Sequence, residues 1–196
     1  MGQMELIQQL REMTGAGIMD CKTALKESEG NIDKAVDYLR QKGKAKAAKK
    51  ASRQANEGVV FSYIHPGDKI GVLLEMNCET DFVARTDDFK SLVKEVAMQI
   101  AAADPRWLKR EEVGEDDLDR EKNIIKTQLE EQGKPTDMIN KIVEGKIGKF
   151  YSENCLIEQA YIRDDKRTIK ELIDDTVAKL GENIQVSRFV RYEVGK

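Results

Sequence analysis

Apolar and polar positions near the start of the chain alternate with a period of about 3.6 residues, which predicts short amphipathic helices. Residues 4–42 divide into three such segments, with breaks at Thr14-Gly15-Ala16-Gly17 and near Gly30. The third segment begins at Asn31, a residue type that favours the N-cap position. Three helices of this length bury only a small core. We therefore predict a docking module here, and the alternative is a packing unit with no partner of its own.

Residues 42–55, KGKAKAAKKASRQA, are rich in alanine and lysine and contain no acidic residue. Both residue types favour helices, so the segment is predicted to be a solvated linker helix. The alternative is a basic strip that binds RNA. That strip would consist of Lys44, Lys46, Lys49, Lys50 and Arg53.

After residue 57 the spacing of apolar positions changes from about 3.6 residues to two, which predicts β-strands. Residues 58–64 and 70–76 form two strand candidates on either side of the turn sequence His65-Pro66-Gly67-Asp68, within a predicted hairpin over residues 58–78. A polar corner follows this predicted hairpin. Beyond it, apolar positions from Phe89 to Ile100 mark a long amphipathic helix that Pro105 ends.

The remainder of the chain predicts further helices and a third strand of the sheet. One helix begins at Glu115-Asp116-Asp117 and ends at Gly133, and another begins at Pro135. A strand near residues 156–162 and a helix over residues 168–180, with Gly181 as its C-cap, follow. Residues 183–194 are predicted to pair with the hairpin as an antiparallel strand. Its apolar face is expected to carry Ile184, Val186, Phe189, Tyr192 and Val194.

Helices grouped against a small antiparallel sheet of about three strands make the predicted fold class α+β. We divide the chain into residues 1–55, the three-helix module with its linker helix, and residues 56–196, an α+β core domain.

The composition leaves the predicted fold class unchanged, but it makes several classes of function less favoured. Charged residues make up 35% of the 196 residues, yet the formal net charge is only −3, without the basic excess of a typical nucleic-acid-binding protein. No apolar run approaches the roughly 20 residues of a membrane span, and the N-terminus does not resemble a signal peptide. The three cysteines are widely spaced and fit reduced thiols. A cytoplasmic location without membrane contact is therefore expected.

Enzyme chemistry is not supported by the residues available. A cysteine hydrolase would need His65, the single histidine, beside a cysteine, but Cys78 is predicted at the opposite end of the second strand. There is no cluster of metal-ligand type and no glycine-rich phosphate loop. We expect no catalytic residues, no metal and no cofactor in this chain.

The polar corner, EMNCETDFVART over residues 75–86, is the segment that these readings explain least. Thr80 and Asp81 are good N-cap residues, so a helix start accounts for both. Phe82 fits this reading only if its ring folds back into the core. From the residues alone, burial of Phe82 and its exposure as a contact residue remain equal alternatives.

Two segments of the chain are similar to the signatures of the elongation factor Ts family. EMNCETDFVAR (residues 75–85) resembles the second signature and LREMTGAGIMDCKTAL (residues 10–25) resembles the first. The resemblance covers essentially the whole chain.

The resemblance implies a translation factor that exchanges guanine nucleotides on elongation factor Tu. The N-terminal helices would have a ubiquitin-associated-like fold and dock on the nucleotide domain of that partner. The residues implied in this docking are Leu10, Arg11, Thr14, Gly15, Gly17, Ile18 and Met19. Thr80, Asp81, Phe82 and Val83 would dislodge the Mg²⁺ beside the partner's bound GDP, with polar contacts from Asp81 and with Phe82 as a wedge between helices.

The resemblance also implies an oligomeric state. Longer members of the family duplicate the core subdomain, whereas this chain carries one copy and ends at Lys196. Short members are thought to compensate by pairing. We therefore expect a homodimer, formed through the sheet that contains the C-terminal strand, which binds two partner molecules. No direct contact with nucleic acid is expected, and the RNA-binding strip is kept as the alternative function.

Overall fold

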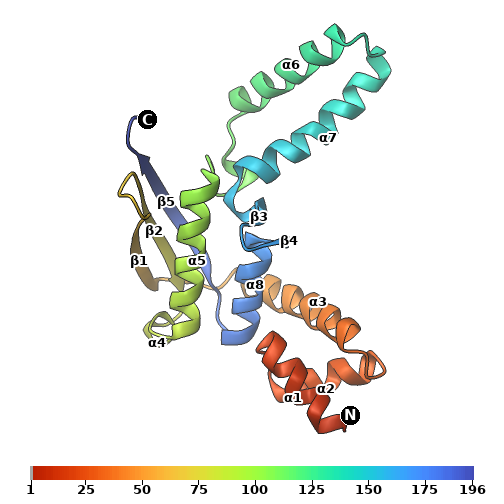
Figure 1. Cartoon of the computed structure of the whole chain (residues 1–196), viewed down its shortest axis with the longest axis vertical. Coiled ribbons are helices and arrows are strands. Elements are labelled where there is room, and N and C mark those ends of the chain that lie inside the picture. Colours follow the sequence, from red (N-terminus) through yellow and green to blue (C-terminus); the bar gives the residue numbers. More distant parts are fainter. Residues whose placement is uncertain (1) are drawn as a thin grey trace. The chain divides into compact units, whose positions relative to one another are not determined.

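The computed structural model describes residues 2–196, with side chains for all of them except residue 137. It has the predicted α+β fold, in which helices accompany a small antiparallel sheet. Figure 1 shows the elements in chain order. The helices are α1 (Gln3–Thr14), α2 (Ile18–Glu27), α3 (Ile32–Lys50), α4 (Asp81–Ala84), α5 (Asp87–Ala103), α6 (Glu115–Glu131), α7 (Thr136–Asn154) and α8 (Ile169–Leu180). The strands are β1 (Glu57–Ile64), β2 (Ile70–Cys78), β3 (Ala160–Tyr161), β4 (Asp164–Thr168) and β5 (Gln185–Glu193).

The chain folds into two compact units. Unit 1 comprises Met1–Phe61, Leu74–Lys94 and Glu171–Ser187, and unit 2 comprises Ser62–Leu73, Glu95–Lys170 and Arg188–Lys196. The N-terminal helices have a core of their own, centred on Leu10, Cys21 and Ala35. The division of the chain at residues 55 and 56 stays a prediction.

Helix α3 differs from its prediction. The third helix and the linker helix were expected as separate elements, but one helix runs without a break from Ile32 to Lys50. Its N-cap is Asn31, as predicted, because the Asn31 side chain accepts a hydrogen bond from the backbone N–H of Lys34 at 2.9 Å. Gly43, the first residue after the predicted three-helix region of residues 4–42, lies inside this helix. It lets α3 lie close to α8, since a Cβ at this position would approach the Cβ of Ala178 to 3.4 Å.

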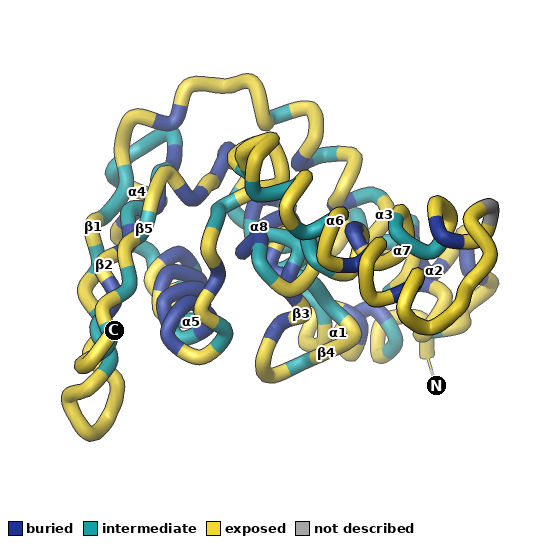
Figure 2. The backbone as a smooth tube through the Cα atoms, turned by 90° about the horizontal axis from the view of Figure 1, so that it is seen from above, coloured by how far each residue is buried: buried dark blue, intermediate teal, exposed yellow. Residues whose placement is uncertain are grey.

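The three-stranded sheet has the order β1-β2-β5, so the predicted third strand is confirmed. The turn of the hairpin is closed by a hydrogen bond of 2.9 Å from the backbone N–H of His65 to the carbonyl of Ile70. Figure 2 shows that the buried positions concentrate in α5. Its inward residues include Phe89, Val93 and Ile100, which agrees with the predicted amphipathic helix.

The predicted apolar face of β5 is only partly correct. Val186 is buried and Phe189 is half-buried, but Tyr192 and Val194 are 72% and 74% exposed. The inward position before Tyr192 is taken by Arg191, whose Nε donates to the carbonyl of Ala101 near the C-terminus of α5 at 3.2 Å. A guanidinium is favourable at that negative end of a helix. Polar side chains therefore occupy the inner face at this end of the strand.

The segment before α8 also differs from its prediction. The strand expected over residues 156–162 is reduced to a 3₁₀ turn (Leu156–Glu158) and the short strand β3, which pairs with β4. Strand β4, DDKRT, lacks apolar alternation, which is why the sequence gave no sign of it. The buried Gln99 of α5 supports β3 from the side, accepting from the backbone N–H of Ile162 at 2.9 Å and donating to the carbonyl of Ala160 at 3.1 Å.

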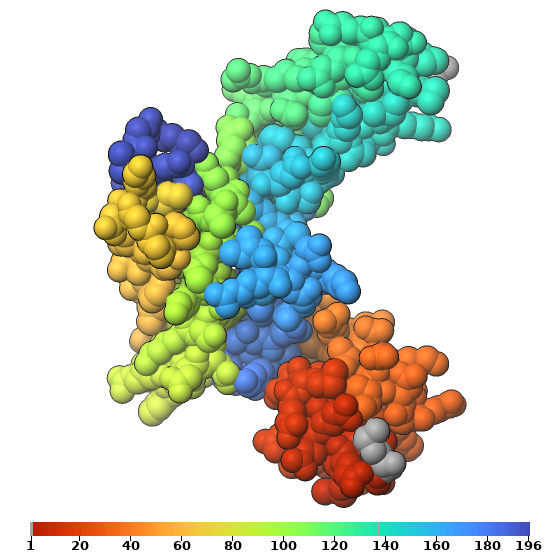
Figure 3. All heavy atoms as spheres, viewed as in Figure 1, coloured from red at the N-terminus to blue at the C-terminus, as the bar shows by residue number. Residues whose placement is uncertain are grey.

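Helices α6 and α7 form an antiparallel hairpin in unit 2 (Figure 1), whose atoms are the green to light-blue spheres of residues 115–154 in Figure 3. Ile125, Leu129, Ile139 and Ile147 form the core between them. Both helices were predicted. Among residues 2–196, none of the helices combines the length and the apolar character that crossing a membrane requires.

Candidate functional site

The polar corner folds as a single helical turn, α4, which follows β2 after Glu79 and Thr80. Thr80 is its N-cap, with extended backbone angles and a side-chain hydroxyl that accepts from the backbone N–H of Val83 at 3.4 Å. Asp81 occupies the first turn, where a carboxylate is favourable, and its side chain pairs with Arg85 at 2.8 Å. Of the two N-cap candidates, Thr80 is the cap and Asp81 the first helical residue.

Phe82 lies on the outside of this turn and is 78% exposed. Ala84 fills the inner side of α4 and is 6% exposed, while Val83 is half-buried. The alternative in which Phe82 is a core residue is therefore wrong. An aromatic side chain in water on a helical turn is available for contact with another molecule.

Hydrogen bonds from the residues before and after α4 hold its two ends in place. The buried thiol of Cys78 donates to the carbonyl of Thr80 at 3.1 Å. After the turn, the Thr86 hydroxyl donates to the carbonyl of Val83 at 2.8 Å and accepts from the backbone N–H of Phe89 at 3.3 Å. Thr86 thereby links the end of α4 to the start of α5.

A third anchor of the corner was not found from the sequence. Glu182, in the segment between α8 and β5, accepts hydrogen bonds from the backbone N–H groups of Glu79 and Thr80 at 3.1 and 3.0 Å. Its other oxygen accepts from the Thr80 hydroxyl at 2.7 Å. The sequence pattern identified Gly181 as the end of α8, but it carried no signal that the next side chain would reach the corner.

The thiol of Cys78 is unsuited to nucleophilic chemistry. Burial, followed by the nearby charge of Glu182, raises its pKa from 9.0 to about 11, whereas reactive cysteines have lowered pKa values. His65 has its own partner, the hydroxyl of Tyr63, at 3.1 Å from Nδ1. Within the part of the chain that is described, there is also no group of three or more potential metal ligands.

The predicted docking residues of the N-terminal module occupy different environments. Leu10 is fully buried, so it supports the surface from within the core. Thr14 donates its hydroxyl hydrogen bond to the carbonyl of Leu10 at 2.7 Å. Gly15, with φ of +66°, ends α1 in the left-handed conformation that glycine adopts most readily, and Gly17 is the N-cap of α2.

Among the predicted docking residues, those whose side chains reach solvent are apolar or basic. Ile18 and Met19 are 53% and 71% exposed, and Arg11 is exposed beside them in the motif. Met13, 57% exposed in the same segment, was not among the predicted residues. Exposed methionines provide an adaptable apolar contact surface.

Most of the basic strip is engaged within unit 1. Lys44 pairs with Glu171 at 2.7 Å, Lys46 with Asp20 at 2.8 Å and Arg53 with Glu79 at 3.5 Å. Lys50 donates to the carbonyl of Gly181. The hydrogen bond from Lys46 also lowers the pKa of Asp20. These charges hold the chain's own acidic groups and carbonyls, which weakens the RNA-binding alternative.

Comparison with known proteins agrees with the resemblance found in the two motifs. The sequence model of the family described as "Elongation factor TS" matches residues 7–196. Elongation factor Ts of Thermoanaerobacter sp. (strain X514) is 58% identical over 192 residues, which cover 98% of this chain and 94% of that protein. Elongation factor Ts of Fervidobacterium nodosum is 57% identical, with 98% of each chain covered, and that of Thermotoga neapolitana is 57% identical, with 98% and 97% covered. This chain therefore belongs to the elongation factor Ts family and is a translation elongation factor, not an enzyme.

Proposed function

We propose that this chain is the guanine-nucleotide exchange factor of elongation factor Tu: it binds the GDP form, displaces Mg²⁺ and promotes GDP release so that GTP can bind. The observation that carries the proposal is the exposed ring of Phe82 on a turn whose backbone is anchored at Thr80. A side chain that is free in the isolated protein but fixed in position suits insertion into another molecule.

The Mg²⁺ beside the nucleotide is a sensitive target for such a wedge. This ion requires nearly ideal octahedral geometry at about 2.0–2.1 Å, so a small displacement of its surroundings weakens its binding. The exchange factor and GDP then oppose each other's binding, and the effect is reciprocal by thermodynamic linkage. Asp81 lies beside Phe82 and would supply the polar contacts of this site.

The energy available from Phe82 sets a limit on its role. Burying a phenylalanine contributes about 1.5–3 kcal/mol, which corresponds to about one to two decades in the rate of GDP release. A larger acceleration requires the remaining contact surface. We assign that part to the N-terminal module, where Ile18, Met19 and Met13 are exposed and Arg11 provides a charge.

The test is the release of fluorescently labelled GDP from purified elongation factor Tu in a stopped-flow instrument. With Mg²⁺ present, increasing amounts of this chain should accelerate release until the rate saturates. The chain should also bind nucleotide-free elongation factor Tu more tightly than the GDP form, by the factor with which it weakens GDP binding. Release at the intrinsic rate throughout the titration would refute the proposed function.

We further propose that the active form is a homodimer that binds two molecules of elongation factor Tu. Unit 2 supports this assembly, because several apolar side chains are exposed on its sheet segments. Its members are Ile64 (59% exposed), Leu73 (47%), Val190 (38%), Tyr192 (72%) and Val194 (74%), and we call them the outer sheet face. A cytoplasmic location and the lack of direct nucleic-acid contact stay predictions.

A further inference from the structure

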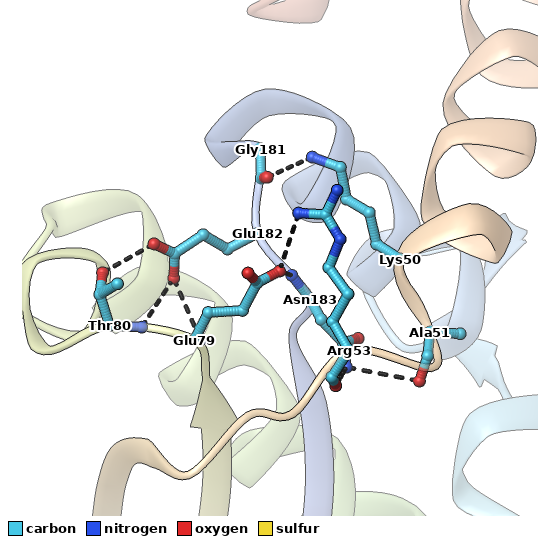
Figure 4. A network of polar contacts seen from close by, with 8 residues as sticks. All are labelled: Lys50, Ala51, Arg53, Glu79, Thr80, Gly181, Glu182 and Asn183. Atoms are coloured by element: carbon cyan, nitrogen blue, oxygen red, sulfur yellow. Dashed lines mark hydrogen bonds and ion pairs between the residues drawn. The ribbon is translucent and has the colours of Figure 1, made fainter.

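Glu182 makes an unusually complete set of contacts with the corner that carries Phe82 (Figure 4). One carboxylate oxygen accepts from the backbone N–H groups of Glu79 and Thr80, and the other accepts from the Thr80 hydroxyl. Between the end of a strand and the first turn of a helix, backbone N–H groups have no partner within their own element. Glu182 satisfies two of them, with hydrogen bonds that its charge strengthens.

The same contact determines how the Thr80 hydroxyl can be used. A carboxylate only accepts hydrogen bonds, so the single hydroxyl hydrogen of Thr80 points to Glu182. The hydroxyl oxygen then presents a lone pair to the backbone N–H of Val83, the bond that caps α4. Glu182 thus orients the cap of the helical turn on which Phe82 stands.

Glu182 is itself held in place by a reciprocal contact. The side chain of Glu79 accepts from the backbone N–H of Asn183 at 2.7 Å, while Glu182 accepts from the backbone N–H of Glu79. Glu79 and Glu182 therefore join the two segments by reciprocal hydrogen bonds, and we call this pair of contacts the clasp. Gly181 makes this possible, because its φ of +82° turns the chain out of α8, and its N–H still bonds the carbonyl of Val177 at 2.9 Å.

The clasp extends to the segment that follows α3. Asn183, which is 4% exposed, donates from Nδ2 to the carbonyl of Arg53 at 2.8 Å, and Arg53 in turn pairs with Glu79. Figure 4 shows these residues converging from three parts of unit 1. The position of the corner is thus fixed relative to the chain segment that leaves the N-terminal helices.

We propose that Glu182 is a positioning residue for nucleotide exchange: its carboxylate keeps the Thr80–Phe82 corner in the geometry that inserts into the partner. The inference rests on the proposed function and deepens it. Without Glu182, the backbone N–H groups of Glu79 and Thr80 and the Thr80 hydroxyl form hydrogen bonds to water instead. The N-cap of α4 then loses its fixed orientation. The corner must then be ordered during binding, which makes productive insertion of Phe82 rarer.

The substitution Glu182→Gln tests the proposal with little change in shape. The amide retains one acceptor oxygen but presents hydrogens where the second oxygen was. The control is Glu171→Gln, which removes another ionised carboxylate of unit 1, paired with Lys44 and outside the clasp. In the free protein, hydrogen exchange of the backbone amides over residues 79–84 should become about tenfold faster in Glu182→Gln and not in Glu171→Gln. Unchanged exchange at these amides would overturn the proposal.

The second readout is GDP release from elongation factor Tu. At saturating amounts, Glu182→Gln should give a maximal release rate about tenfold lower than the wild type when Mg²⁺ is present. Removal of Mg²⁺ with EDTA should close most of this gap, because the ion is no longer there to be displaced. A gap of the same size in EDTA would assign the defect to general damage, and no gap with Mg²⁺ would exclude a positioning role.

The two readouts separate this proposal from the proposed function. If the wild type itself fails to accelerate GDP release, the exchange function is refuted, and hydrogen exchange at residues 79–84 still decides whether Glu182 holds the corner. In a combined variant, Thr80→Val with Glu182→Gln, the second change should slow release by clearly less than it does in the wild type. The Thr80–Glu182 hydrogen bond is then already absent, and only the contacts with the two backbone N–H groups are left to lose. Fully additive losses would contradict the shared contact.

Discussion

At the scale of single residues, Phe82 and Phe89 have opposite roles although they lie close together in the sequence. Phe82 is 78% exposed, and Phe89 is fully buried in α5. Phe82→Ala should therefore change the free energy of unfolding by no more than about 0.5 kcal/mol. The same variant should slow GDP release from elongation factor Tu by about one to two decades, the value of one buried phenylalanine.

Phe89→Ala provides the contrast. Removing a fully buried phenylalanine should lower the free energy of unfolding by about 3–5 kcal/mol, as measured by urea denaturation.

Unchanged GDP release with a folded Phe82→Ala variant would refute the role of the Phe82 ring as a wedge. A large loss of stability in Phe82→Ala would contradict its exposure.

The buried thiols should make the free energy of unfolding decrease as the pH rises into the alkaline range. Burial raises the pKa of Cys155 from 9.0 to about 11, so the thiolate forms more readily in the unfolded chain than in the folded one. The stabilising contribution is complete below pH 9 and is lost as the pH rises toward 11. The urea midpoint should fall between about pH 8 and about pH 10, and it should fall less in Cys155→Ala. Equal losses in both proteins would show that Cys155 does not contribute.

At the scale of elements, helix α7 contains two glycines that its own packing does not require. Apart from the adjoining backbone of α7 itself, Cβ atoms added to Gly145 or Gly148 would meet no atom within 4 Å. Glycine inside a helix is less favourable than alanine by about 1 kcal/mol. Gly145→Ala and Gly148→Ala should each raise the free energy of unfolding by about 0.5–1 kcal/mol, as measured by urea denaturation.

Gly58 in β1 is the matched opposite. Its φ is +143°, and a Cβ there would lie 2.1 Å from the carbonyl oxygen of Met76. Gly58→Ala should therefore destabilise the protein strongly. If alanine at positions 145 and 148 also proved destabilising, the low helix propensity of these glycines would not be what limits the stability of α7.

The comparison of predicted and observed elements shows which physical signals the sequence contains. The hairpin, α5 and the Asn31 cap were predictable because apolar period, turn residues and capping residues act locally. The inward position of Arg191 and the existence of β4 were not, since both depend on partners distant in the chain. The same holds at the candidate site. The Thr80 cap was readable from neighbouring residues, whereas the contact with Glu182 spans 102 positions.

At the scale of the whole molecule, the basic segment after Tyr38 stabilises the fold of unit 1. Lys44 and Lys46 form ion pairs with Glu171 and Asp20, and Lys50 bonds to Gly181. We therefore expect only weak RNA binding, measured by fluorescence anisotropy with a labelled RNA. Tight binding that falls steeply with salt, and that Lys44→Ala with Lys49→Ala abolishes, would restore the RNA-binding alternative.

The proposed homodimer gives the last prediction. The outer sheet face carries exposed apolar side chains on all three strands of the sheet. Its most exposed members are Tyr192 in the C-terminal strand and Val194 directly after it. Tyr192→Asp would bury a charge against a second copy, which costs far more free energy than it does in water. Light scattering at micromolar concentration should give the dimer mass for the wild type and the monomer mass for Tyr192→Asp. Met138→Asp, which places the same charge at a 51% exposed apolar position on α7 outside this face, should remain dimeric. A monomeric wild type would refute pairing, and a dimeric Tyr192→Asp would move the interface to another surface.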